Sequence, residues 1–123
     1  MSDVSRLSTR QGPSFDVSKL RTAVDTIELF RTLDAEMQAQ TMMCLLAVAQ
    51  AHPTPIPMRE VAHLVGLAQS STSRNIALLG KTHRKGLPGL DLVNAREDVV
   101  DRRTKVVFLT SRGERFVHQL LKG

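Results

Sequence analysis

A cluster of positive charge beside a strand-like segment is the part of this sequence best suited to bind a ligand. The segment begins at Asp101 and ends at Thr110. Its basic residues are Arg102, Arg103 and Lys105. This order predicts a β-hairpin that carries arginines at its tip and is anchored on a buried strand. Guanidinium and ammonium groups bind phosphates, and a cationic tip suits insertion into a DNA groove. The segment therefore predicts nucleic-acid binding.

The composition also indicates a polyanionic partner. The 123 residues include 17 Lys and Arg against 12 Asp and Glu, a formal net charge of +5. Neutralising phosphates releases counterions, and the free energy of this release supplies most non-specific affinity for DNA.

A chain of this length is expected to form one domain with its own core. One cysteine excludes an intramolecular disulfide, and no secretory signal or membrane-length apolar run is apparent, so we expect a cytoplasmic, nucleoid-associated protein.

The N-terminal part predicts an arm followed by an amphipathic helix. Residues 1–15 are rich in Ser, Gly and Pro, which is typical of a flexible arm. Residues 16–33 place apolar side chains three or four positions apart behind a capping Asp16. This narrow apolar seam can pack on its own domain or on the same helix of a second subunit. The residues expected at such a dimer contact are Leu20, Val24, Ile27 and Phe30.

A second helix is expected to be central and buried. It restarts at Asp34, and residues 42–49 form a continuous apolar run. A helix that is apolar all round is typical of a protein core. The prolines at 53, 55 and 57 must end it, because proline blocks helical hydrogen bonding.

Residues 57–79 match a helix-turn-helix position by position. Ala62 is small where two helices cross closely, and Gly66 supplies a left-handed turn between them. The second helix is expected to bury Thr72, Ile76 and Leu79. Its short polar residues suit close approach to base edges, and those expected to contact DNA are Gln69, Ser70, Ser71, Ser73 and Arg74. Two ordinary surface helices would be the alternative.

The segment after this helix predicts a hairpin. Residues 90–96 and 105–109 alternate as two antiparallel strands, and 97–104 form the tip. Gly86 is expected to end the preceding helix. The basic exit from that helix is expected to contact phosphates through Lys81, His83, Arg84 and Lys85.

The predicted fold is mainly α with a small β-hairpin, a winged helix-turn-helix with flanking N- and C-terminal helices. Residues 16–123 form its single domain. Core or dimerisation helices are expected at 16–51, the helix-turn-helix and wing at 53–110, and a C-terminal helix at 111–122. Thr110 caps that last helix, whose expected inner face is Phe116, Val117, Leu120 and Leu121.

At these residues the sequence resembles the multiple antibiotic resistance regulator (MarR) family of bacterial winged-helix transcription factors. The wing motif of the family is matched by Asp101, Arg103, Leu109, Thr110 and Gly113. The helix-turn-helix pattern is matched by Glu60, Val61, Ala62, Gly66, Leu67 and residues 70–74. The resemblance covers roughly residues 40–120. It implies that Arg103 inserts into the minor groove and that Asp101 steadies the hairpin.

Several positions depart from the family pattern. Ala68 stands where a Ser or Thr cap is common. Thr72 replaces a typical Val, so its hydroxyl is expected to donate a hydrogen bond to a backbone carbonyl one turn back.

Gly123 comes before the additional helix with which family members dimerise, so we expect a dimer to depend on residues 16–33, helped by the short last helix. A small-molecule effector and redox sensing by Cys44 gain little support, whereas a regulatory protein partner stays open.

The expected function is that of a homodimeric transcriptional repressor on a pseudo-palindromic double-stranded operator. Two other classes stay open: a winged-helix DNA-binding protein of replication, partition or nucleoid organisation, and a protein-interaction adaptor. The histidines at 52, 63, 83 and 118 are scattered, and no nucleophile motif or phosphate loop is present. We therefore expect no enzyme activity, no cofactor and no metal.

Overall fold

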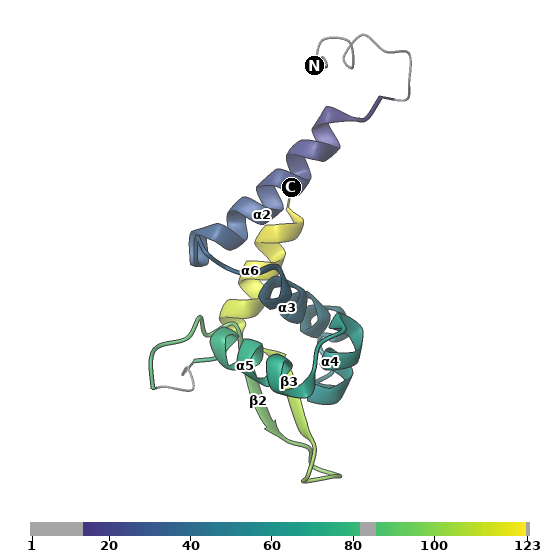
Figure 1. Ribbon diagram of the computed structural model, residues 1–123, viewed down its shortest axis with the longest axis vertical. Helices are drawn as coiled ribbons and strands as arrows, with labels where there is room; N and C mark the ends of the chain where they lie inside the picture. The colour runs from purple at the N-terminus through teal and green to yellow at the C-terminus, as the bar shows by residue number, and fades with distance from the viewer. Residues whose placement is uncertain (1–13, 82–85, 123) are drawn as a thin grey trace.

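The computed structural model describes residues 14–81 and 86–122. Within these residues, helices and a small antiparallel sheet follow one another in the order that a winged helix-turn-helix requires (Figure 1). The predicted fold class is confirmed. The elements are α2 (Val17–Leu33), α3 (Ala39–Ala51), β1 (Ile56–Pro57), α4 (Met58–Val65), α5 (Gln69–Leu79), β2 (Val93–Glu97), β3 (Lys105–Leu109) and α6 (Ser111–Leu121).

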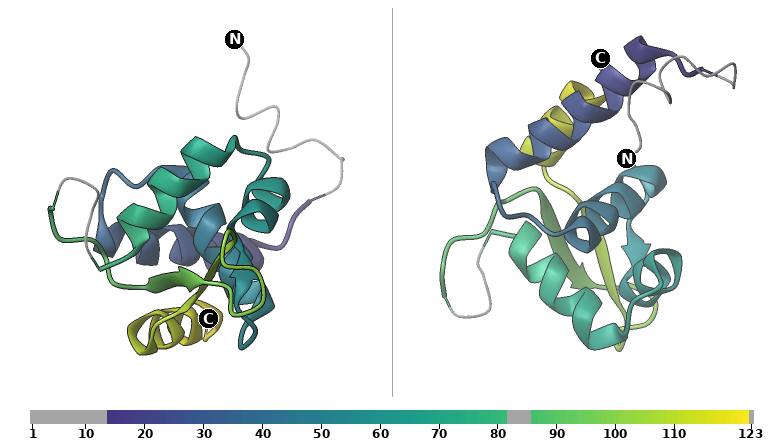
Figure 2. Two further views of the ribbon diagram at one scale, coloured as in Figure 1. Left: turned by 90° about the horizontal axis from the view of Figure 1, so that it is seen from below. Right: turned by 45° about the horizontal axis from the view of Figure 1, so that its top comes forward.

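Helices α2 and α6 lie side by side, and the N-terminal half of α2 projects away from the rest of the protein (Figures 1 and 2). Asp16 caps α2 by accepting a hydrogen bond from the backbone N–H of Ser18, as predicted for a helix start. The Phe30 ring packs edge-on against Phe116 of α6, with 5.3 Å between ring centroids. Phe30 is 1% exposed, so it is a core residue of this chain and lies outside the exposed stripe to which the dimer prediction assigned it.

Helix α3 is the central buried helix, but it begins later than predicted. Residues 34–38 form a turn, because the Asp34 carboxylate accepts a hydrogen bond from the Glu36 backbone N–H at 2.9 Å. A side chain that bonds its own backbone two residues on favours a turn over a helix. The buried residues of α3 are Thr41, Cys44, Leu45, Ala47 and Val48. They pack against α4, α5 and the sheet.

The helix-turn-helix is formed by α4 and α5. Gly66 has a φ of 78°, the left-handed conformation predicted for it, and its N–H donates to the Ala62 carbonyl. Helix α5 ends at Leu79, and Gly80, not Gly86, is its C-cap residue. The chain turns here because the Leu92 N–H donates to the Leu79 carbonyl at 2.7 Å, which ties the helix end to the start of β2.

The sheet has the strand order β1-β3-β2, antiparallel throughout. Strand β3 has the predicted bounds, whereas β2 begins three residues later than expected. The short β1 was not predicted, because its two residues include a proline and show no alternation. Glu97 pairs with Lys105, so the tip consists of residues 98–104.

Helix α6 is fastened to the base of the hairpin. The Thr110 hydroxyl oxygen caps the helix by accepting from the Gly113 N–H, as predicted, and the hydroxyl donates to the Asp91 carbonyl at 2.7 Å. A Cβ added at Gly113 would lie 2.0 Å from the Leu92 carbonyl oxygen, so only glycine fits there. Phe116 and Leu120 are buried, but Leu121 is 79% exposed and does not belong to the inner face. No described helix is both long and apolar enough to span a bilayer.

Candidate nucleic-acid interface

The exposed face of α5 is polar and carries no acidic residue. Gln69, Ser70, Ser73 and Arg74 are exposed, as the sequence predicted. Ser71 is half-buried, and its hydroxyl accepts a hydrogen bond from the Arg74 guanidinium at 3.2 Å. Short hydroxyl and amide side chains with one arginine can donate to and accept from base edges and phosphates.

The first turn of α5 has no side-chain cap. Ala68 occupies the N-cap position and makes no side-chain hydrogen bond. The Thr72 hydroxyl donates to the Ala68 carbonyl at 3.0 Å, the partner expected for it. The first backbone N–H groups of a helix have no intrahelical partners. The start of α5 therefore presents donors and a positive helix end, which suit an anion.

The wing tip is closed by hydrogen bonds from Asp101. One carboxylate oxygen accepts from the backbone N–H of Arg103 at 3.1 Å and lies 3.5 Å from its side-chain Nε. The other oxygen accepts from the Thr104 hydroxyl at 3.0 Å. The Arg103 N–H, together with the Thr104 hydroxyl, holds the pKa of Asp101 below its ordinary value. Arg103 itself is 93% exposed at its side chain, so the guanidinium remains available to a ligand.

Arg59 connects the wing to α4, and sequence reasoning missed it. Its guanidinium donates to the Thr104 hydroxyl at 3.0 Å, across 45 residues of sequence. Thr104 in turn donates to Asp101. The hairpin tip is therefore fastened to the helix-turn-helix, and nothing local in the sequence around Arg59 marks this contact.

A depression lies between α5 and the wing. It has a volume of about 220 Å³, and we call it the wing hollow. Its lining residues are Met58, Arg59, Gln69, Ser73, Arg103, Thr104 and Lys105. Three of these are cationic and none is acidic. The structure thus brings four of the predicted residues together around one hollow with a basic lining: Gln69 and Ser73 of α5, and Arg103 and Lys105 of the wing.

Among the predicted basic contact residues, some are exposed and others lie outside the described part of the chain. Arg102 and Lys105 are exposed on the wing, and Lys81 is exposed just after α5. His83, Arg84 and Lys85 fall outside the described residues. The Arg96 guanidinium, which the sequence did not single out, lies 5.7 Å from the centre of the Phe108 ring on the neighbouring strand.

Helix α2 carries an exposed apolar stripe. Leu20 is 50% exposed, Val24 is 42% exposed and Ile27 is 51% exposed. Leu121, at the end of the adjacent α6, is also exposed. Apolar side chains repeated along one helix face can pack against a second copy of the helix.

Among the described residues, a histidine and a carboxylate form a pair but no larger group of metal-binding side chains. The His52 imidazole lies 3.7 Å from the Glu114 carboxylate, and His118 lines the same shallow pocket. Across residues 14–81 and 86–122, no three His, Cys, Asp or Glu side chains could hold a metal ion. Cys44 is fully buried, and burial raises the pKa of its thiol to about 11. A neutral, buried thiol is unreactive.

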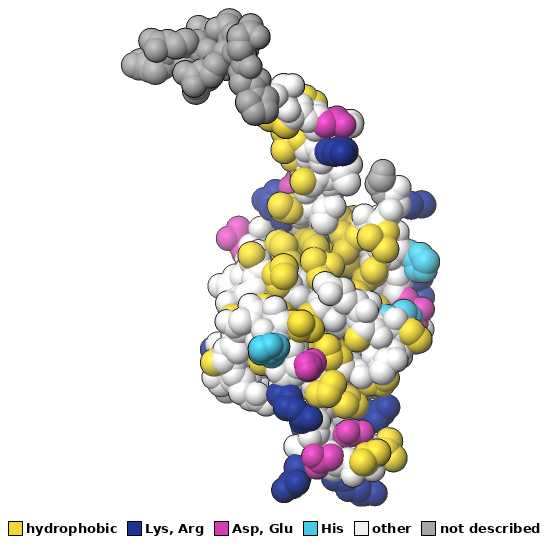
Figure 3. Space-filling view, turned by 90° about the vertical axis from the view of Figure 1, so that its right-hand side faces the viewer, with side chains coloured by type: hydrophobic (Ala, Val, Ile, Leu, Met, Phe, Trp, Pro, Cys, Tyr) yellow, Lys and Arg dark blue, Asp and Glu magenta, His cyan; other side chains and the backbone are white. Residues whose placement is uncertain are grey.

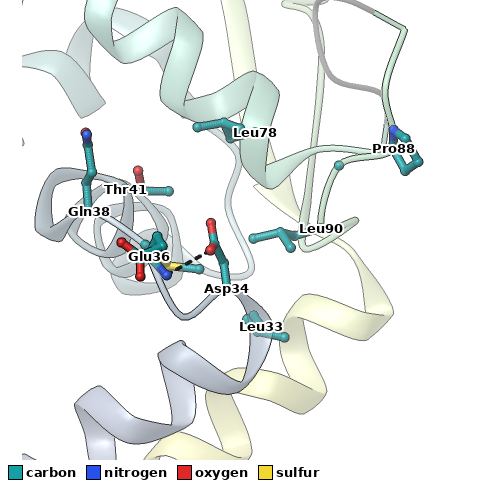
Figure 4. Close-up of a pocket in the computed structure, with 10 residues that line it drawn as sticks. Leu33, Asp34, Glu36, Gln38, Thr41, Leu78, Pro88 and Leu90 are labelled. Atoms are coloured by element: carbon teal, nitrogen blue, oxygen red, sulfur yellow. Dashed lines mark hydrogen bonds between the residues drawn. The ribbon is translucent and has the colours of Figure 1, made fainter.

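A larger pocket of about 450 Å³ lies between the α2–α3 turn and the end of α5 (Figure 4). Apolar side chains from Leu33, Leu78 and Leu90 face it, together with the carboxylates of Asp34 and Glu36. The described residues that line this pocket include two acidic residues and no cationic residue. The site also lies apart from the wing hollow, with which it shares no lining residue.

Solved structures of low sequence identity share this fold. The PcaV transcriptional regulator from Streptomyces coelicolor is 24% identical, with 86% of this chain and 73% of that chain covered and a TM-score of 0.56. A mutant of MepR from a multidrug resistant S. aureus clinical isolate is 16% identical, with 89% and 77% covered and a TM-score of 0.63. Transcriptional regulator Tm0710 from Thermotoga maritima is 18% identical, with 84% and 64% covered and a TM-score of 0.63.

Sequence comparison alone finds neither a matching family model nor a matching curated protein. The likeness is therefore one of architecture, carried by the order and packing of α2 to α6 and the hairpin. This chain has the winged helix-turn-helix fold of these solved structures.

Proposed function

We propose that this protein is a sequence-specific double-stranded DNA-binding transcription regulator of the MarR type, and that it acts as a homodimeric repressor. The observation that carries the proposal is the wing hollow, where Gln69 and Ser73 of α5 meet Arg103 and Lys105 of the wing. A helix and a hairpin on one basic surface suit a major groove and its neighbouring minor groove. Two of the structures that share the fold are named transcriptional regulators.

Each part of the surface takes a separate role in this proposal. The residues of α5 that read base edges in the major groove are Gln69, Ser70, Ser71, Ser73 and Arg74. Arg103 enters the minor groove, supported by Asp101 and flanked by Arg102 and Lys105. Lys81, His83, Arg84 and Lys85 contact phosphates, which position the protein without reading sequence.

The exposed stripe of α2 forms the dimer contact. Leu20, Val24 and Ile27 are open to solvent in the single chain, and burying them against a second copy removes apolar surface from water. Two recognition helices would then lie about one helical turn, roughly 34 Å, apart on a pseudo-palindromic site. An Ile27→Asp substitution places a charge in this contact and shifts the protein to monomer. Leu64→Asp, at an exposed leucine of α4, is the control.

The test is a selection of bound duplexes from a random DNA pool, with the stoichiometry of the complex measured by sedimentation. The proposal expects a two-fold related motif and two chains per duplex. Recovery of duplexes without a common motif would support a replication, partition or nucleoid protein instead. Affinity for DNA that is absent, or that does not fall with added salt, would contradict DNA binding and favour a protein-interaction adaptor.

A further inference from the structure

The tip of the wing exposes two apolar side chains that the proposed function leaves without a role. Val99 is 80% exposed and Val100 is 93% exposed. At the lower end of the molecule, where the hairpin ends, hydrophobic side chains lie beside Lys and Arg side chains (Figure 3). These valines contribute almost nothing to the core of the chain, so their surface is available to a ligand.

Hydrogen bonds within the tip hold the backbone that carries the valines. The Asp98 N–H donates to the Thr104 carbonyl at 2.8 Å, and the Thr104 N–H donates to the Asp101 carbonyl at 2.9 Å. The hydrogen bond from Arg59 to Thr104 ties this turn to α4. The two side chains are therefore presented at a defined place, and binding them costs little conformational entropy.

The charges around the valines decide what they can contact. From residue 97 to residue 105 the chain has three acidic residues and three basic residues. The acidic residues offset part of the attraction of the exposed Arg102 and Arg103 to phosphates. An apolar contact by the two exposed valines would add affinity that these charges do not supply. The walls of a DNA minor groove are lined by deoxyribose C–H groups, which accept apolar side chains.

We infer that Val99 and Val100 contact the deoxyribose walls of the minor groove beside Arg103. The wing then binds the groove through apolar as well as cationic side chains. The inference rests on the proposed DNA binding and deepens it. The guanidinium of Arg103 responds to the negative potential of the groove, whereas the valines respond to its shape. The two contributions differ in their dependence on salt.

The experiment uses a duplex that the wild-type protein recovers from a random DNA pool, with affinity measured by fluorescence anisotropy at several salt concentrations. Replacing both residues, Val99→Thr and Val100→Thr, keeps the branched shape and replaces one methyl group of each side chain by a hydroxyl. We expect the Kd to rise about fivefold to tenfold. The slope of log K against log salt should stay unchanged, because no phosphate contact is lost. Arg103→Ala should lower that slope.

Two comparisons separate a groove contact from a general effect. The Thr variant should match wild type on a duplex shortened to remove the flanking minor groove, and a Val99→Ile, Val100→Ile variant should bind the full duplex at least as tightly as wild type. Met43→Gln, at an exposed apolar residue of α3, should bind as wild type does. Equal Kd values for wild type and the Thr variant on the full duplex would overturn the inference, as would a changed salt slope. If the wild-type protein recovers no duplex, the proposed function fails as well.

Discussion

The Thr41 hydroxyl of α3 donates a hydrogen bond to the side-chain oxygen of Asn75 on α5, and both residues are almost fully buried. The Asn75 amide nitrogen donates to the Ser71 carbonyl at 2.8 Å. A buried polar pair of this kind has one good arrangement, whereas apolar contacts tolerate several. It therefore fixes the rotation of α5 about its own axis, and with it the set of side chains that α5 presents.

The Thr41–Asn75 pair should be energetically coupled. Asn75→Ala leaves the Thr41 hydroxyl without this acceptor, so we expect a loss of about 1 to 3 kcal/mol in the free energy of unfolding. In the background of Thr41→Val, the same substitution should cost less, since the hydroxyl is already gone. Urea unfolding of both single variants and the double variant measures the difference. Additive losses would show that the two side chains do not interact.

Arg103→Ala should weaken DNA binding by about 1 to 3 kcal/mol. The loss should be greatest for duplexes with A·T-rich flanks, because narrow minor grooves concentrate negative potential. Titration of duplexes that differ only in their flanks checks this. Arg115→Ala, at an exposed position of α6, removes the same formal charge away from the wing and should have little effect. Equal losses for the two variants would contradict insertion of Arg103.

Ser70 and Arg74 should determine sequence preference. Substituting either one should change the preferred bases by about 1 to 3 kcal/mol at one or two positions of the site, and leave other positions alone. Repeating the selection from random DNA with each variant measures the change. Lys81→Ala provides the contrast, because losing a phosphate contact should weaken all sequences about equally. An unaltered motif for both α5 variants would remove them from the interface.

The buried thiol of Cys44 should make stability depend on alkaline pH. Burial raises its pKa to about 11, so the folded state holds the proton more tightly than the unfolded state. This contribution is complete below the ordinary pKa of a thiol and is lost as pH rises through the raised value. Urea unfolding across this range should show a decline that is smaller in Cys44→Ala. Fast reaction of the native thiol with iodoacetamide near neutral pH would contradict its burial.

Features determined by local chemistry could be predicted from the sequence. Asp16 and Thr110 cap helices because their side chains reach backbone N–H groups within three residues. Gly66 was predicted because a left-handed turn favours glycine. The end of α5 was placed wrongly because two glycines follow it. Hydrogen bonds from the chain that returns toward β2 end the helix at Gly80. A sequence pattern does not show these bonds.

Features determined by tertiary contacts could not be predicted in this way. Ile27 and Phe30 both belong to the apolar seam of α2 in the sequence. In the structure, Phe30 is buried against Phe116 of α6, whereas Ile27 is exposed. Asparagine is a polar residue that is usually exposed on a helix. Asn75 is buried because the Thr41 hydroxyl supplies its hydrogen-bond partner. Arg59 joins the site only because the folded chain brings the wing tip beside the start of α4.

In the proposed function, the surface formed by α5 and the wing recognises base sequence as well as phosphate charge. The most direct measurement compares the Kd of the protein for its best selected duplex with the Kd for a duplex of the same composition in scrambled order, at one fixed salt concentration near physiological. We expect a ratio of at least about a thousandfold, typical of specific regulators. A ratio close to one would show that only phosphates are recognised and would contradict the assignment of α5 as a recognition helix.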